Sequence, residues 1–512
     1  MAKESAKKEL RHVRHKNEMQ ELELHHAKTR TDMQTLALRR ASTRNAIRAQ
    51  RRGYDGAKTG RHVDGWVTAS IDSDAEIAKA SGRVRDRARD LVRNNPFAAK
   101  AVMVHASYMV GSGITPNPKG ETEELDSQVT NAWNDFAENC DVDGRTTFYG
   151  IQNLMVRSMV ESGECLLQFV RKPSTFQPSL PLQLRVLECD HIDSTRDKNL
   201  PGGGFIQNGI EFDSFGTRVA YWLFPRHPGS ARMGGSMQSI RVVANDIVHL
   251  FDRARPGQNR GVSWFAPVML RMRDLDDYDL SELIRKKMES SVTALVTGAP
   301  APDSTGGETD AEGRKIEGLE PGMVQYLEPG EDIRFTQPVS VSGYAEYVSV
   351  LNHAVAAGLG IPYELMTGDL SKISFSSVRA GFLAFRRLMS SKQNLLLIPQ
   401  LCQPVWKQFL PAAQVSGLVG KGVIRLQWTP PIFESVDPVK DMMAQILAVR
   451  AGSMSPQTAI AQNGYDLDVI MAEFQAYYKM VDDANAVFNF DARKTTDNGL
   501  AKLETPNAPT AP

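Results

Sequence analysis

Two amphipathic helical stretches that flank a segment rich in glycine and proline constrain the fold of this 512-residue chain most strongly. In each stretch the apolar residues are spaced for one stripe of a long helix, and in the second they recur every three or four positions. The stripe of the first consists of Trp264, Val268, Met272, Leu275, Leu283, Met288 and Val292. That of the second consists of Tyr344, Tyr347, Val348, Leu351, Ala354, Val355, Gly358 and Leu359. Residues 298–343 favour loops, with short strands at 322–327 and 332–335, so we predict two long helices that flank a compact insertion.

The part of the chain before these helices mixes further helices with short strands. Helical patterns cover residues 74–94, 97–110 and 151–163. Short apolar runs bounded by Gly and Pro are typical of antiparallel strands, and they lie at residues 165–171, 182–187, 209–224 and 241–251. Arg85, Arg89 and Arg93 recur every four residues, which predicts a solvated, salt-bridged helix face. The sequence therefore predicts an α+β fold.

The part of the chain after the second helix is mostly helical. Residues 367–377 form a polar loop, and a long helix begins near Ser376, with Pro399 and Pro404 expected to kink or end it. We then predict a strand over 423–427 and helices over 437–452 and 455–484. The polar, proline-containing residues 489–512 are expected to be a disordered tail.

Residues 1–60 form a basic arm. They contain 15 Lys and Arg against 7 Asp and Glu, and no proline precedes Pro96. Residues 18–52 are rich in strong helix formers but carry only a thin apolar stripe. We predict a long exposed helix or a disordered arm, and the sequence leaves open whether it contacts a partner or is simply solvated.

Composition limits the classes of protein to which the chain can belong. Its length suits two to four domains, and 41% hydrophobic residues suffice for their cores. Lys+Arg and Asp+Glu balance at 60 each, which excludes a uniformly basic nucleic-acid-binding protein. The four cysteines lack zinc-ligand spacing and are typical of buried thiols in a reducing cytoplasm. We see no secretory signal and no apolar run of about 20 residues, so we expect a soluble protein with no membrane partner.

No motif for catalysis or cofactor binding is present in the sequence. It lacks a Walker phosphate loop, a G-x-S-x-G turn and an H-E-x-x-H zinc motif. Two acidic pairs, Asp190 with Asp193 and Asp274 with Asp277, keep open an enzyme with a hidden metal site, although solvated carboxylates are the commoner interpretation. His249 lies in an apolar run and is interpreted as structural. We expect no enzyme activity, no cofactor and no metal.

Five short stretches are notable for their order and spacing. They are Arg89–Pro96, Val110–Ile114, Gly209–Asp213 with Val219–Trp222, Pro256–Val262, and Leu365–Asp369 leading into Phe375–Gly381. No single stretch is decisive, but together they resemble the portal proteins of lambda-type tailed phages. The resemblance covers about Arg83 to Gln427 and does not extend to residues 1–60 or to the C-terminal tail.

The resemblance implies the phage portal fold, which has a wing, a two-helix stem, a small clip, a tunnel loop and a helical crown. Its parts would be the arm (1–60), wing (61–261), first stem helix (262–295), clip (296–339), second stem helix (340–360), tunnel loop (361–377), long wing helix with the last strand (378–434), crown (435–488) and disordered tail (489–512). It also implies a homo-oligomeric ring, usually of twelve copies, at one capsid vertex of a virion that is made in a host bacterial cytoplasm.

The resemblance further implies that double-stranded DNA passes through the ring during packaging and ejection. Expected partners are a terminase motor, a head–tail connector and a major capsid or scaffold protein. A channel for moving DNA should not grip it, because each Lys or Arg bound to phosphate adds affinity. Our candidates for DNA-facing residues are Lys372, Ser371, Ser374 and Ser376, and more weakly Arg285, Lys286 and Lys287. The alternative is a nucleic-acid-binding or adaptor protein that acts through its basic N-terminal arm.

Overall fold

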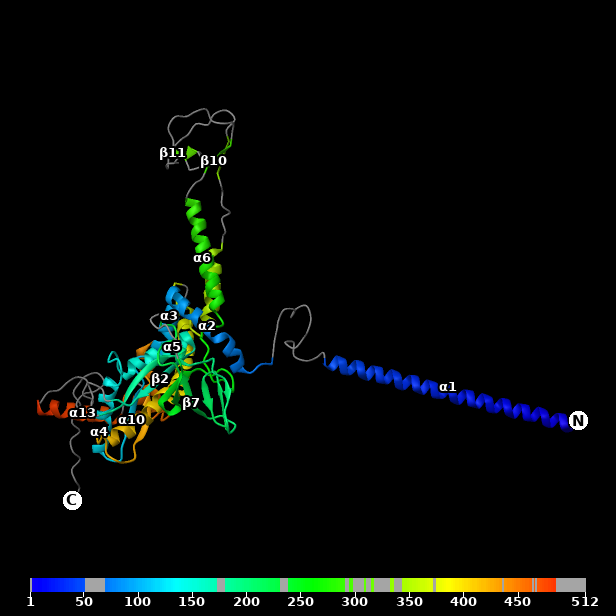
Figure 1. Cartoon of the computed structure of the whole chain (residues 1–512), viewed down its shortest axis with the longest axis horizontal. Coiled ribbons are helices and arrows are strands. Elements are labelled where there is room, and N and C mark those ends of the chain that lie inside the picture. The colour runs from blue at the N-terminus through cyan, green and yellow to red at the C-terminus, as the bar shows by residue number, and fades with distance from the viewer. Residues whose placement is uncertain are drawn as a thin grey trace, which may run out of the picture. The chain divides into compact units, whose positions relative to one another are not determined.

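The computed structural model, drawn in Figure 1, divides into two compact units, Met1–Ile71 and Asp72–Pro512. It describes residues 2–50, 70–172, 180–230, 238–290, 294–297, 308–309, 315–316, 332–335, 343–371, 374–434, 437–462, 465 and 467–484. None of the described helices combines the length and the apolar composition that crossing a lipid bilayer requires.

In the first unit, residues 2–50 form one long helix, α1 (Ala2–Gln50), which Figure 1 draws in blue. Its sequence has no Gly or Pro and is rich in Ala, Glu, Lys and Leu, which favour helices. Every described side chain along it is exposed, including Leu10 and Met33. The arm is therefore helical over these residues, which was one of the two predicted forms.

The second unit is built around two antiparallel sheets. One has three strands in the order β3 (Gln183–Glu188), β2 (Glu164–Val170) and β9 (Ile247–Phe251). The other has five strands in the order β4 (Lys198–Asn199), β5 (Phe205–Gln207), β6 (Ile210–Phe212), β7 (Arg218–Leu223) and β8 (Ile240–Val243). The predicted antiparallel strands of this region are confirmed, and the mixture of helix and sheet agrees with the predicted α+β class.

Four helices form the layer beside the three-stranded sheet. They are α2 (Ser73–Asn94), α3 (Pro96–Val110), α4 (Glu123–Asn139) and α5 (Phe148–Ser162). Helix α5 packs directly against the strands of the sheet, and α2, α3 and α4 pack against α5. Asn95 separates α2 from α3, because its side chain accepts hydrogen bonds from the N–H groups of Phe97 and Ala98, both at 3.0 Å. Trp133 of α4, which is buried, packs in the core against Phe148 and Phe409 with ring centroids 5.4 and 5.0 Å away.

The two long helices predicted around the insertion are α6 (Met269–Ser290) and α7 (Tyr344–Leu359). The prediction for the first, residues 262–295, is wrong at both ends. Residues 264–268 form turns, in which the Trp264 N–H donates to Val160 O and Pro267 has no N–H to donate. At the other end, β10 (Ala294–Thr297) has replaced the helix.

Strand β10 pairs antiparallel with β13 (Asp332–Phe335), so the chain segments beyond α6 and before α7 are joined. Inside the insertion, β11 (Glu308–Thr309) pairs with β12 (Lys315–Ile316). The predicted strand at 332–335 is confirmed, and the one predicted at 322–327 lies outside the described residues.

The chain after α7 is more helical than predicted. A short helix, α8 (Tyr363–Thr367), occupies part of the predicted loop 361–377, and α9 (Phe375–Lys392) begins inside it. The expected end of the helix at Pro399 or Pro404 is wrong, because helix continues through the π-helical segment η5 (Gln393–Cys402) into α10 (Gln403–Val415), whereas the alternative of a kink there stays a prediction. Pro399 lies within the π-helical segment, and Pro404 is the second residue of α10.

The C-terminal part of the described chain closes the core and then forms three helices. Strand β14 (Arg425–Thr429) pairs with β1 (Thr115–Lys119), joining segments far apart in the sequence. The helices are α11 (Pro438–Arg450), α12 (Pro456–Gln462) and α13 (Leu467–Asp483), in agreement with the predicted helical end. Asp437 caps α11, because its side chain accepts a hydrogen bond from the Lys440 N–H at 3.3 Å.

Candidate functional site at the paired helices

Helices α6 and α7 contact each other through tyrosine rings. Tyr278 stacks on Tyr344 with centroids 5.7 Å apart and meets Tyr347 edge-on at 5.2 Å. The Tyr344 hydroxyl donates to Asp279 at 2.8 Å, and this bond to a carboxylate raises the pKa of Tyr344 to about 12. These contacts hold the two helices side by side.

The acidic residues of α6 point to different partners and do not converge on one site. Asp276 accepts from the Asn95 amide at 2.8 Å, and Asp279 accepts from Tyr344. Asp277 pairs with Arg273 one turn away at 3.2 Å, and Asp274 is exposed. This dispersal does not favour the alternative of a metal held by Asp274 and Asp277.

The outer faces of the pair carry large apolar side chains. On α6 these are Leu280, Leu283 and Ile284, and on α7 they are Tyr347 and Val350, all between 48% and 67% exposed. Their spacing of three and four residues places them in stripes along the helices. Exposed apolar side chains that recur along a helix in this way are typical of a protein–protein contact.

The loop between α8 and α9 holds some of the predicted DNA-facing residues. Ser371 folds back on Asp369, since its N–H and hydroxyl both donate to Asp369 Oδ1 at 3.0 and 2.6 Å. Ser374 is exposed, whereas Lys372 and the Ser376 side chain lie outside the described residues. The segment between α8 and α9 extends over fewer residues than the predicted loop, because α8 and α9 occupy its two ends.

The predicted candidates on α6 are less available as cations than the sequence indicated. Arg285 forms a two-point contact with Glu282, with N–O distances of 2.8 and 2.5 Å, which lowers the pKa of Glu282. Lys286 and Lys287 are exposed on the same turn. Arg285 is consequently a weaker candidate for phosphate contact than the sequence indicated.

The residues just before α6 are anchored by a buried charge cluster that the sequence analysis missed. Arg260 Nη2 donates to Glu164 Oε1 at 2.6 Å, and Arg260 Nε lies 3.0 Å from both carboxylate oxygens. His249 Nε2 and the Gly261 N–H donate to Glu164 Oε2 at 3.0 and 2.8 Å. The side chains of Glu164 and Arg260 are 1% and 4% exposed. His249 is therefore a structural histidine, as predicted.

Within this cluster the negative charge of Glu164 is balanced by the positive charge of Arg260. Burial alone would raise the pKa of Glu164, but Arg260 and His249 hold it well below its usual value. Burial lowers the pKa of His249, so that ring is neutral near pH 7 and donates through Nε2. Glu164 and Arg260 thus remain an ion pair inside the fold.

Two glycines let the chain pass close to this cluster. A Cβ atom on Gly261 would lie 2.1 Å from Gly163 O, and Gly163 itself has a φ of +93°. Gln258 supports the turn, because its side-chain oxygen accepts from the N–H groups of Ala254 and Arg255. The stretch 256–262, singled out in the sequence, is therefore the connection between sheet and paired helices; nothing in the sequence indicated that Glu164 is its partner.

The arginines of α2 form a second, tertiary cluster. Arg89 pairs with Asp190 at 2.7 Å and with Glu188 at 2.9 Å, and Arg85 lies 3.2 Å from Asp190. The predicted salt-bridged character is confirmed, but the predicted solvation is wrong for Arg85 and Arg89, whose side chains are mostly buried. The ion pairs use carboxylates distant in sequence, which periodicity cannot reveal.

The same cluster weighs against the alternative metal site at Asp190 and Asp193. Glu188, Asp190 and His227 are close enough to share an ion, but a metal would have to displace the two guanidinium groups. Asp193 is not part of this group and accepts from the hydroxyls of Ser239 and Thr195, both at 2.7 Å. A metal-dependent enzyme therefore receives no support from either acidic pair.

Comparison with protein families identifies the chain. The family described as phage portal protein, lambda family, matches residues 59–393, about two thirds of the length. The chain belongs to this family. A portal protein of this family is a subunit of the portal vertex, and this is the role of the chain.

Curated relatives support the same assignment. The probable portal protein of Halomonas phage phiHAP-1 is 24% identical over 438 residues, which cover 80% of this chain and 83% of the relative. The portal protein of Escherichia phage N15 and portal protein B of Escherichia phage lambda are also 24% identical, and each match covers 82% of this chain and 88% of the relative.

Solved structures with a similar chain come from gene transfer agent particles. A chain in the virion of a native particle is 14% identical, with a TM-score of 0.41, and the match covers 80% of this portal protein and 96% of that chain. A chain in the native neck, computed with C12 symmetry, is 15% identical, with a TM-score of 0.41 and coverages of 74% and 93%.

The buried cluster makes a prediction about stability. Arg260→Leu leaves Glu164 buried without its counter-ion, which should lower the free energy of unfolding by about 3–5 kcal/mol in urea denaturation at pH 7. The difference from the unaltered protein should narrow as the pH falls. Above the usual carboxyl pKa of 4.5 it narrows because burial raises the pKa of Glu164 in the variant, which takes up a proton there; below 4.5 it narrows further because the unaltered protein loses the stability that its ionised Glu164 contributes.

The control for this variant is Arg273→Leu, which removes an exposed pair whose side chains are 66% and 58% accessible. It should change the free energy of unfolding by less than about 0.5 kcal/mol. Equal effects of the two substitutions would contradict the anchoring role of Arg260.

Proposed function

We propose that this portal protein assembles into a closed ring of about twelve copies through which double-stranded DNA enters and leaves the virion. The observation that carries the proposal is the α6–α7 pair. Two packed helices lead to a lobe closed by β10 and β13, and their outer faces are apolar and exposed. Such helices suit the wall of a channel built from several copies.

The parts of the chain are assigned on this basis. The wing comprises α2 to β9, the stem comprises α6 and α7, and the clip is the insertion between them. The segment between α8 and α9 is the tunnel loop, α9 to β14 returns to the wing, and α11 to α13 are the crown. The helix α1 is a separate arm.

The stem face is proposed as a contact between neighbouring copies. A ring of identical subunits needs two different surfaces that fit each other, so that each copy uses both. Leu283 and Ile284 on α6 and Val350 on α7 supply apolar area that one copy leaves in water. Covering this area in the ring is favourable at about 25 cal/mol per Å².

The channel is proposed to hold DNA weakly. The chain has no net charge, and Arg285 already pairs with Glu282. Lys372, with Ser371, Ser374 and Ser376, remains the candidate lining of the tunnel loop, and Lys286 and Lys287 that of the stem. Few cations available to bind phosphate mean few released counterions and a low affinity that does not stall DNA.

The protein is proposed to be non-catalytic, with the chemical work done by its partners. A terminase motor would dock on the clip and hydrolyse ATP, and a head–tail connector would replace it. A major capsid or scaffold protein would bind the wing. Assembly would begin in the cytoplasm of a bacterial host.

Native mass spectrometry with negative-stain imaging of the purified protein tests the ring. A closed ring of about a dozen copies with a central hole is the expected result. A monomer or dimer that persists at high concentration would overturn the proposal.

The stem face gives a sharper prediction. The double variant Leu283→Glu with Ile284→Glu should fold as a monomer, with unfolding within about 0.5 kcal/mol of the unaltered chain, but should fail to form rings. Its matched control is Val415→Glu, because Val415 is 89% exposed and lies at the end of α10, away from the stem. Rings formed by the stem variant would rule out this interface.

The basic arm provides the test of the alternative function. A variant that lacks residues 1–60 should form the same rings in native mass spectrometry, because α1 belongs to a unit separate from the portal body. Two results together would favour the alternative function. The full chain would form no ring, and it would bind nucleic acid at low salt only when residues 1–60 are present.

A further inference from the structure

Helix α11 exposes more apolar surface than its own chain covers. None of its residues is buried, although Val439, Met442, Met443, Ile446 and Leu447 are all large and apolar. Met442, Ile446 and Val449 follow one another at helical spacing along one face. An ordered helix of this kind requires a covering partner to offset the cost of leaving apolar area in water.

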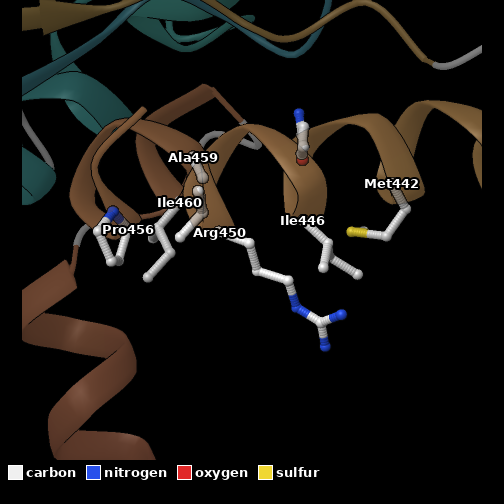
Figure 2. Close-up of a pocket in the computed structure, with 8 residues that line it drawn as sticks. Met442, Ile446, Arg450, Pro456, Ala459 and Ile460 are labelled. Atoms are coloured by element: carbon white, nitrogen blue, oxygen red, sulfur yellow. The ribbon is translucent and has the colours of Figure 1, made fainter. Parts of the chain in front are cut away.

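The uncovered face of α11 forms a groove with α12. The groove has a volume of about 380 Å³ and is lined by Met442, Gln445, Ile446, Val449, Arg450, Pro456, Ala459 and Ile460. Figure 2 shows Met442, Ile446 and Arg450 projecting from α11 on the same side, with Pro456, Ala459 and Ile460 beside them. Arg450 is the one charged residue of the lining, and it forms no ion pair with another residue that the structure describes.

Helix α13 carries the complementary face. Its inner side is partly covered, with Val481 5% exposed. Its outer side presents Val469, Glu473 and Met480, which are spaced by four and seven residues and therefore lie on one face. Val469 and Met480 are 55% and 66% exposed, and Glu473 between them has no ion-pair partner among the described residues.

We propose that the outer face of α13 of one copy occupies the α11–α12 groove of the next copy, with Glu473 paired to Arg450. The inference rests on the proposed ring and specifies one of its contacts. Groove and face belong to the same chain and differ from each other, so each copy can use both, as a closed ring requires.

The charges favour this occupant over the others. Contact between two identical grooves would place Arg450 against Arg450, and contact between two α13 faces would place Glu473 against Glu473. Nucleic acid is disfavoured, because residues 437–484 contain seven acidic and three basic residues. The head-to-tail contact brings together opposite charges within an apolar surround, where an ion pair is least screened.

A disulfide experiment on the full chain tests the geometry. The variant carrying both Met442→Cys and Val469→Cys should, on mild oxidation, give a ladder of oligomers up to the ring size on a non-reducing gel. A disulfide forms only between Cα atoms about 4.4–6.8 Å apart, so the ladder reports direct contact. The four native cysteines are buried and should not contribute.

The controls separate the possible outcomes. Met443→Cys with Val469→Cys places a thiol on an adjacent, equally exposed position outside the groove and should stay monomeric on the gel. Dimers from either single variant would show a symmetric contact and overturn the inference. If the Met442→Cys/Val469→Cys variant forms rings but gives no ladder, the proposed contact between α13 and the groove is overturned and the proposed ring is not. If the unaltered protein forms no rings, the proposed ring itself is overturned.

Charge reversal tests the ion pair. Arg450→Glu and Glu473→Arg, each placed in the Met442→Cys/Val469→Cys background, should lower the cross-linking yield several-fold at low salt, because like charges then face each other. Combining the two reversals should restore the yield. A combined variant no better than the single ones would exclude the Arg450–Glu473 pairing.

Discussion

The ion pair between Glu164 and Arg260 determines where the chain leaves the sheets and enters the paired helices. Removing both charges from water is costly, and the two-point contact with added donors from His249 and Gly261 offsets that cost. If residues 256–262 were shifted along the chain relative to the sheet, Glu164 or Arg260 would be buried without its partner. The pair therefore acts chiefly by excluding alternatives, and it fixes the start of α6 at Met269.

Both ends of the helix pair are tied to the same body. The chain enters α6 from the Arg260 connection, and α7 ends at Leu359, whose carbonyl accepts from His105 Nε2 at 3.1 Å. Burial lowers the pKa of His105 to about 4, so the ring is neutral and can keep this hydrogen bond over a wide pH range. Trp264 meets the same ring edge-on at 4.8 Å, which links the two anchors directly.

Sequence reasoning recovered the elements whose pattern is local and missed those that depend on tertiary context. Helices α3 and α7 were predicted from periodicity, whereas α4 was missed although Leu125, Val129 and Trp133 mark its buried stripe. Strand β1 was hidden by its two prolines, which a two-stranded edge tolerates. The stripe of α6 was extended to Trp264 because a buried turn also needs apolar residues. The partners of Arg89 and Arg260 could not be foreseen, since long-range ion pairs leave no spacing signal.

The balance of charges in this chain bears on how a ring could hold firmly and still let DNA move. Its neutrality arises from 60 cations matched by 60 anions, and many are already paired, as Arg89 is with Asp190 and Arg285 with Glu282. Paired cations offer little to phosphate, so DNA would meet a surface with few counterions to release. Contacts between copies would then rest on apolar area such as Leu283, Val350 and Met442, which salt does not screen. Changes of ionic conditions around packaged DNA would alter its grip on the channel far more than the cohesion of the ring.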